Sequence, residues 1–193
     1  MSISSVPFVA LDRQYLKYKS EIDAAFERVA LSGVYVLGPD VAEFEKELAE
    51  ICNVKYAIAV ANGTDALVLS LRALGIGDGD EVITAPNSFI ASAGSIIAVG
   101  ATPKFCDVRD DHNMDPTKLE AVITSKTKAI MPVHLTGRPA PMDEINAIAK
   151  KYGLYVIEDS AQAIDAKYKG RAVGSLGDMG CFSLHPLKNL FVM

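Results

Sequence analysis

The pattern of apolar and polar residues predicts two amphipathic helices at the start of the chain. In the first, apolar side chains recur every three or four residues, and Gly33 follows as a helix-ending glycine. The second begins near Pro39, a residue that suits a first helical turn. The apolar positions are Tyr15, Tyr18, Ile22, Phe26 and Val29 in the first helix, and Val41, Phe44, Leu48 and Ile51 in the second. We therefore expect an N-terminal helical segment over residues 1–55.

Beyond residue 55, short apolar runs alternate with stretches of helical periodicity. Some strand runs are apolar throughout, as in Ala57–Val60, which is typical of strands buried on both faces. The predicted strands are Tyr56–Ala61, Glu81–Ala85, Pro103–Val108, Ala129–Leu135, Leu154–Glu158 and Gly180–Leu184. The predicted helices are Thr64–Leu74, Ser88–Val99, Pro116–Ile123 and Met142–Tyr152. This alternation predicts an α/β fold with three layers (α/β/α) and a mostly parallel central sheet over residues 56–193.

Composition excludes several classes of protein. Half of the 193 residues are hydrophobic, and the net charge of -5 argues against a nucleic-acid partner. No apolar run is long enough to cross a membrane, and Met1–Ser5 does not begin a signal peptide. Three widely spaced cysteines, Cys52, Cys106 and Cys181, suit a reduced cytoplasmic protein better than a disulfide framework or a zinc site. We expect no metal, no membrane and no nucleic acid.

Polar residues follow most of the predicted strands, where an open parallel sheet binds its ligands. They are Asn62–Asp65, Pro86–Phe89, His134, Asp159 with Gln162, and Ser183 with His185 and Lys188. Because the carboxyl ends of parallel strands share one edge, we expect these residues to gather there.

Each candidate has both a chemical and a structural interpretation. Gly63 and Thr64 could offer backbone N–H groups to a phosphate, or the turn could be a simple helix cap made by Asn62 or Thr64. Asp159 ends an apolar run and could pair with a protonated ring nitrogen, cap the strand or bind a metal. Lys188 could form an imine or be an ordinary surface charge.

Two further side chains are equally open. Phe89 could stack on an aromatic ring or belong to the core. His134 could move a proton or serve a structural role. We assign no role to His112, which lies in a polar loop.

Six segments, taken together in order and spacing, resemble the DegT/DnrJ family of nucleotide-sugar aminotransferases. These enzymes depend on pyridoxal 5′-phosphate (PLP) and share the fold of aspartate aminotransferase (fold type I). The resemblance covers the chain from about Phe8 to its end. The segments are Asn62–Leu67, Pro86–Ala91, Pro132–Leu135, Glu158–Ala163, Gly174–Asp178 and Phe182–Leu190.

The resemblance implies roles for individual residues. Lys188 would hold PLP as a Schiff base and move a proton, and Asp159 would keep the pyridine nitrogen protonated. The remaining cofactor contacts would be Gln162 to the phenolic oxygen, Phe89 to the ring face, and Gly63, Thr64 and Ser183 to the phosphate.

The resemblance also implies the reaction and its partners. The amino donor would be L-glutamate, the acceptor a keto group of a nucleotide-linked sugar, and the enzyme a cytoplasmic homodimer. The family's C-terminal small domain is missing from this chain, and Thr136–Gly137 stands where the family usually has Tyr-Gly.

Other functions remain as alternatives. A sugar dehydratase of the same family would carry a histidine in place of Lys188, and a truncated member could be inactive or regulatory. A dinucleotide dehydrogenase would need G-x-G-x-x-G after its first strand, and a hydrolase would need G-x-S-x-G, and the sequence has neither.

Overall fold

The structure is a computed structural model that describes residues 6–190. The chain divides into two compact units between Phe44 and Glu45, within helix α2. The segment Met1–Ser5, which we examined for a signal peptide, and residues Phe191–Met193 lie outside the described range. The division predicted between residues 1–55 and 56–193 stays a prediction.

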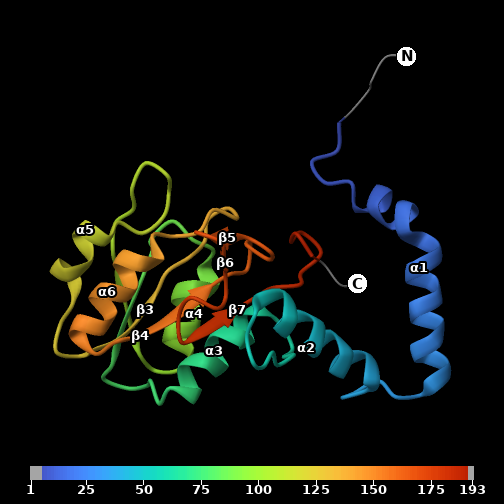
Figure 1. The fold of residues 1–193 in the computed structure, drawn as a ribbon, viewed down its shortest axis with the longest axis horizontal. Helices are drawn as coiled ribbons and strands as arrows, with labels where there is room; N and C mark the ends of the chain where they lie inside the picture. The colour runs from blue at the N-terminus through green and yellow to red at the C-terminus, as the bar shows by residue number, and fades with distance from the viewer. Residues whose placement is uncertain (1–5, 191–193) are drawn as a thin grey trace. The chain divides into compact units, whose positions relative to one another are not determined.

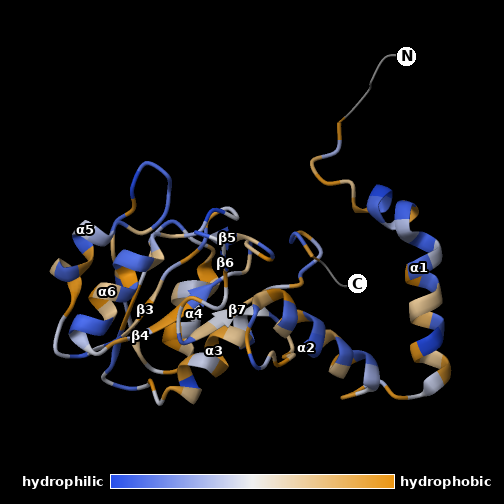
Figure 2. Cartoon of the chain, viewed as in Figure 1, coloured by the Kyte–Doolittle hydropathy of each residue, from blue (hydrophilic) through white to orange (hydrophobic). Residues whose placement is uncertain are grey.

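Both N-terminal helices are confirmed. Helix α1 spans Leu11–Ser32 and ends at Gly33, which has a positive φ of 67° and whose N–H bonds to Ala30 O. Helix α2 spans Pro39–Cys52. No residue of α1 is buried, and hydrophobic bands alternate with hydrophilic ones along it (Figure 2).

The second unit is built on a five-stranded sheet whose strands are all parallel. The strand order is β2-β1-β3-β4-β7. The strands are β1 (Glu81–Thr84), β2 (Thr102–Phe105), β3 (Thr127–Met131), β4 (Tyr155–Asp159) and β7 (Met179–Cys181). A separate two-stranded antiparallel hairpin, β5 (Lys167–Tyr168) and β6 (Arg171–Ala172), was not predicted.

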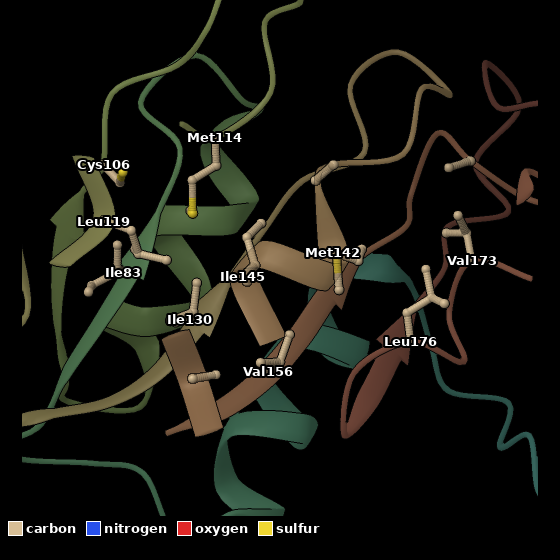
Figure 3. Close-up of a cluster of buried hydrophobic side chains, with 13 residues drawn as sticks. Ile83, Cys106, Met114, Leu119, Ile130, Met142, Ile145, Val156, Val173 and Leu176 are labelled. Atoms are coloured by element: carbon tan, nitrogen blue, oxygen red, sulfur yellow. The ribbon is translucent and has the colours of Figure 1, made fainter. Parts of the chain in front are cut away.

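Helices cover both faces of this sheet, which confirms the three-layer α/β fold (Figure 1). One buried cluster joins Ile130 and Val156 to Met142 and Ile145 of α6 (Figure 3). The other joins Met131 and Ile157 to side chains of α3 and α4. The helices are α3 (Gly63–Ala73), α4 (Ile90–Ala98), α5 (Pro116–Leu119), the 3₁₀ turn η1 (Glu120–Val122) and α6 (Met142–Tyr152).

The predicted strand Tyr56–Ala61 is wrong for the described structure. The segment carries no strand assignment, and Tyr56 and Ile58 are 72% and 80% exposed. A strand requires a neighbour that accepts and donates its backbone hydrogen bonds, and within residues 6–190 none lies beside this segment. The Ala59 N–H bonds instead to the Glu45 side chain, at 2.7 Å.

Other boundaries differ because local residues stop regular structure. The strand predicted over Ala129–Leu135 ends at Met131, and Pro132 follows with no N–H to donate. The last strand is the three residues of β7, shorter than Gly180–Leu184. The helix predicted over Pro116–Ile123 is one α-turn followed by a 3₁₀ turn. No helix within residues 6–190 combines the length and apolar character that spanning a bilayer requires.

Candidate functional site

The carboxyl end of β4 forms backbone hydrogen bonds with neighbouring segments on both of its edges. The Asp159 N–H donates to Pro132 O at 2.9 Å, and the Asp159 carbonyl accepts from the His134 N–H at 3.1 Å. Across the other edge of β4, the Ser160 N–H donates to Cys181 O at 2.8 Å. The backbone around Asp159 is therefore fixed between the segment after β3 and the end of β7.

The Asp159 side chain is a buried carboxylate with two hydrogen-bond donors. Ser92 Oγ donates to Oδ2 at 2.6 Å, and the Ala161 N–H donates to Oδ1 at 3.3 Å. The residue is 5% exposed. Within residues 6–190 no cationic side chain forms an ion pair with it. A buried charge without a counter-charge is costly, so this position favours a cationic ligand group.

The start of α3 meets the segment that follows β7. A Cβ built on Gly63 would lie 2.8 Å from Ser183 Cβ and 3.2 Å from Phe182 O, so only glycine allows this approach. Asn62 caps the helix by accepting from the Asp65 N–H at 2.9 Å. The structural interpretation of a cap is thus confirmed for Asn62.

The same cap leaves donors available for an anion. The N–H groups of Gly63 and Thr64 belong to the first turn of α3 and have no acceptor among residues 6–190. Free amides at a helix N-terminus attract negative charge. Gly63 lies beside Ser183, which is half-buried, and Thr64 is the next residue of the helix. These three residues therefore form a cradle with the donors that a phosphate requires.

The remaining predicted residues lie in loops that follow strands or begin helices. Lys188 is half-buried in a turn after β7, and its N–H donates to His185 O at 2.8 Å. Gln162 is half-buried in the turn that follows Asp159. Phe89 precedes α4 and is 68% exposed, so the core interpretation of Phe89 is wrong. The roles of Lys188, Gln162 and Phe89 towards a cofactor stay predictions.

Sequence reasoning missed a buried network around Glu158, the residue before Asp159. Its Oε1 accepts from the Leu176 and Gly177 N–H groups at 2.7 and 2.8 Å. Its Oε2 accepts from Gly174 N–H at 2.9 Å and pairs with His134 Nε2 at 3.0 Å. Burial by itself would raise the pKa of Glu158, but these hydrogen bonds outweigh it and leave the pKa below its ordinary value.

The hydrogen bonds of the network determine the tautomer of His134 and indicate its role. His134 Nδ1 accepts from the Ala140 N–H at 2.9 Å, so the ring proton belongs on Nε2, where it is donated to Glu158. The ring is fully buried. Both nitrogens are therefore occupied, and the structural interpretation of His134 is correct.

The Glu158 network also contacts the cradle indirectly, through the loop 174–177. It holds the loop 174–177, and Gly174 lies so close to the Phe182 ring that a Cβ would stand 2.4 Å from Cζ. Phe182 directly precedes Ser183. Glu158 thus fixes a loop on which the Phe182–Ser183 segment packs.

A second missed residue is Ser92, the donor to Asp159. The sequence holds a weak signal for it, because Ser88 and Ser92 are four residues apart and so share one side of a helix start. Nothing in the sequence shows that this side faces β4.

The sequence profile of the DegT/DnrJ/EryC1/StrS aminotransferase family matches residues 17–193. The chain belongs to this family. It is 52% identical over 179 residues to the dTDP-3-amino-3,6-dideoxy-alpha-D-galactopyranose transaminase of Aneurinibacillus thermoaerophilus. The matched region covers 92% of this chain and 49% of that protein. The family predicted from the sequence is thereby confirmed.

Two solved structures superpose closely on the fold of this chain. The structure of S. venezuelae DesV, in complex with a ketimine intermediate, superposes with a TM-score of 0.94 at 45% identity and covers 97% of this chain and 51% of that one. The structure of NtdA from Bacillus subtilis, with bound cofactor PMP, gives 0.93 at 37% identity, covering 100% and 44%. The chain spans about half the length of the relatives it matches.

The residues present fit PLP. Among residues 6–190 no cationic side chain pairs with the buried Asp159 carboxylate, which suits the protonated nitrogen of a pyridine ring. The cradle of Gly63, Thr64 and Ser183 has room because glycine carries no Cβ, and its free amides suit the phosphate.

Proposed function

We propose that the intact protein is a PLP-dependent aminotransferase that transfers an amino group from L-glutamate to a keto group of a nucleotide-linked sugar. Membership of an aminotransferase family supports the reaction class, and the name of the A. thermoaerophilus relative supports a nucleotide-linked sugar as substrate. The bound PMP in the B. subtilis structure supports the cofactor. A cytoplasmic homodimer is part of the same proposal.

The observation that carries the proposal is the buried Asp159 carboxylate at the end of β4, which forms no ion pair with any of residues 6–190 and lies beside the end of β7. A carboxylate in this setting stabilises positive charge on a ring nitrogen. When bound, PLP supplies an electron sink for the carbon that loses a proton. Asp159 keeps that sink effective by holding the ring nitrogen in its charged form.

The other residues bind and orient. Gly63, Thr64 and Ser183 would hold the phosphate, Phe89 would lie against the ring face, and Gln162 would donate to the phenolic oxygen. These contacts restrict the cofactor to one orientation.

Lys188 supplies the reactive amine. Its amine would hold the cofactor covalently, and in its free form it would take up and release a proton at the substrate carbon. A histidine at this position would point to dehydration instead, and the lysine favours amino transfer.

Reductive trapping tests the proposal on the full-length protein. Purified protein with PLP should absorb in the visible, and sodium borohydride should attach the cofactor to the peptide that contains Lys188. With glutamate and a nucleotide-linked keto sugar, the protein should form 2-oxoglutarate. Lys188→Ala should lose both the trapped label and turnover, with turnover falling at least ~10²-fold because general acid–base catalysis contributes that much.

A matched variant guards against a general effect of removing a lysine. Lys150→Ala removes an exposed lysine of α6 and should leave trapping and turnover at the level of the unaltered protein. A label on a lysine other than Lys188, or protein that stays colourless with PLP, would refute the proposed function.

A further inference from the structure

The start of α4 carries two features that bear on the candidate site. Phe89 directly precedes the helix, and Ser92 lies in its first turn, where its N–H donates to Phe89 O at 3.1 Å. Ser92 is 1% exposed, and its Oγ lies 2.6 Å from Asp159 Oδ2. One helical turn therefore fixes the backbone at Phe89 relative to Ser92, whose hydroxyl reaches Asp159.

A second hydroxyl sets the direction of the hydrogen bonds. Ser88 Oγ lies 2.9 Å from Ser92 Oγ. A carboxylate only accepts, so Ser92 commits its proton to Asp159, and Ser88 then donates to Ser92. Donation from Ser88 polarises the Ser92 hydroxyl and strengthens its bond to the carboxylate.

These hydrogen bonds orient the Asp159 carboxylate and leave some of its acceptor positions open. Oδ2 holds Ser92 and Oδ1 holds the Ala161 N–H, while a carboxylate has about four acceptor positions. Held at both oxygens, the carboxylate cannot rotate freely about χ2. Its open positions then point in fixed directions.

We propose that Ser92, supported by Ser88, is a positioning residue that holds the Asp159 carboxylate against the ring nitrogen of PLP and keeps the shared proton on that nitrogen. This inference rests on the proposed function. The proton argument follows from the hydrogen bond, since a donor to a carboxylate stabilises its ionised form. Without Ser92, Asp159 attracts the shared proton more strongly and the ring nitrogen loses positive charge.

The test compares three serine variants of the full-length protein. Ser92→Ala removes the hydroxyl, and Ser92→Thr restores one at the same position. Ser95→Ala is the matched control, because Ser95 is equally buried on α4 but donates to Ser92 O and makes no hydrogen bond to Asp159. Each variant is titrated with PLP by absorbance, and the ¹⁵N chemical shift of ring-labelled PLP is recorded in the bound state.

Ser92→Ala should raise the dissociation constant for PLP about tenfold, the size of one hydrogen bond to a charged group. It should also move the ¹⁵N signal towards that of unprotonated pyridine. Ser92→Thr should recover most of both changes, and Ser95→Ala should leave the ¹⁵N signal in place.

Three outcomes would overturn the inference. An unchanged ¹⁵N signal in Ser92→Ala shows that the hydroxyl does not act on the ring nitrogen. An equal shift in Ser95→Ala shows that helix packing, not the hydroxyl, is responsible. If the unaltered protein binds no PLP, the proposed function fails and this inference fails with it, whereas normal binding with a silent Ser92→Ala removes this inference alone.

Discussion

Replacing Glu158 by glutamine should destabilise the protein severely, although the two side chains have nearly the same shape. Glu158 is fully buried and accepts four hydrogen bonds, two at each carboxylate oxygen. Glutamine replaces one oxygen with an NH₂ group, which donates and cannot accept. Whichever way the amide lies, two N–H donors lose their acceptor.

His134 cannot relieve this conflict. If its proton moved to Nδ1, Nε2 could accept from the glutamine, but Nδ1–H would then face the Ala140 N–H that it now accepts from. Each lost hydrogen bond to a charged group costs about 1.5–3 kcal/mol, so two cost roughly 3–6 kcal/mol. That is a large share of a typical folding free energy of about 5–15 kcal/mol.

Equilibrium denaturation of the full-length protein measures this loss. Glu144→Gln is the matched control, because Glu144 lies on α6 and its carboxylate accepts one exposed hydrogen bond, from Tyr168. It should change the unfolding free energy by less than about 0.5 kcal/mol. A Glu158→Gln protein that loses no more than the control would refute the argument that four donors converge on this carboxylate.

Glu158 should also make the folded protein less stable at acidic pH. The pKa of Glu158 in the folded state lies below its ordinary value of 4.5. Its stabilising effect is therefore fully present above about pH 4.5 and is lost as the pH falls through the lower folded value. The difference in unfolding free energy between the unaltered protein and Glu158→Gln should be constant near neutral pH and should shrink on acidification below pH 4.5.

Two further predictions concern the surroundings of the cradle. Gly63→Ala should weaken PLP binding at least about tenfold in the same absorbance titration, because its Cβ would stand 2.8 Å from Ser183 Cβ. Gly94→Ala is the control, because its Cβ would meet nothing within 4 Å. It should bind PLP normally and gain up to about 1 kcal/mol of helix stability. Burial raises the pKa of the Cys181 thiol to about 12, so iodoacetamide at pH 8 should label Cys181 only after denaturation, and rapid labelling of the folded protein would contradict the burial of this thiol.

The periodicity of the sequence is enough to predict the layered fold. An apolar run such as Tyr155–Ile157 predicts burial between two layers, and Val156 and Ile157 indeed belong to clusters on opposite faces of the sheet, although Tyr155 is exposed. The segment Ala57–Val60 has the same apolar character but forms no strand, because a strand also needs a neighbour and hydropathy does not encode one. The hairpin of β5 and β6 escaped prediction since two-residue strands leave no periodic pattern.

The site was predictable where one side chain emerges at the end of one strand. Asp159 could be found in this way, because topology alone brings strand ends to one edge. The turn at Gly63 was expected after a strand over Tyr56–Ala61, which the described structure does not contain. Ser92 could not be found, since its role depends on which side of α4 faces β4, and that follows from packing between distant segments. The distance between Gly63 and Ser183 is likewise invisible in a sequence that separates them by more than a hundred residues.

The sequence alone cannot tell the adjacent carboxylates Glu158 and Asp159 apart, although their surroundings differ. Successive residues of a strand point to opposite faces, so Glu158 lies on the side of Val156, and Asp159 lies on the side of Ile157 and α4. Both are buried, yet Glu158 receives four donors, including three amides of the loop 174–177. Asp159 receives two donors and no cation within residues 6–190. Within residues 6–190 the protein satisfies the first charge with four donors and gives the second only two, and a loop that lies sixteen or more residues further along the chain makes this difference.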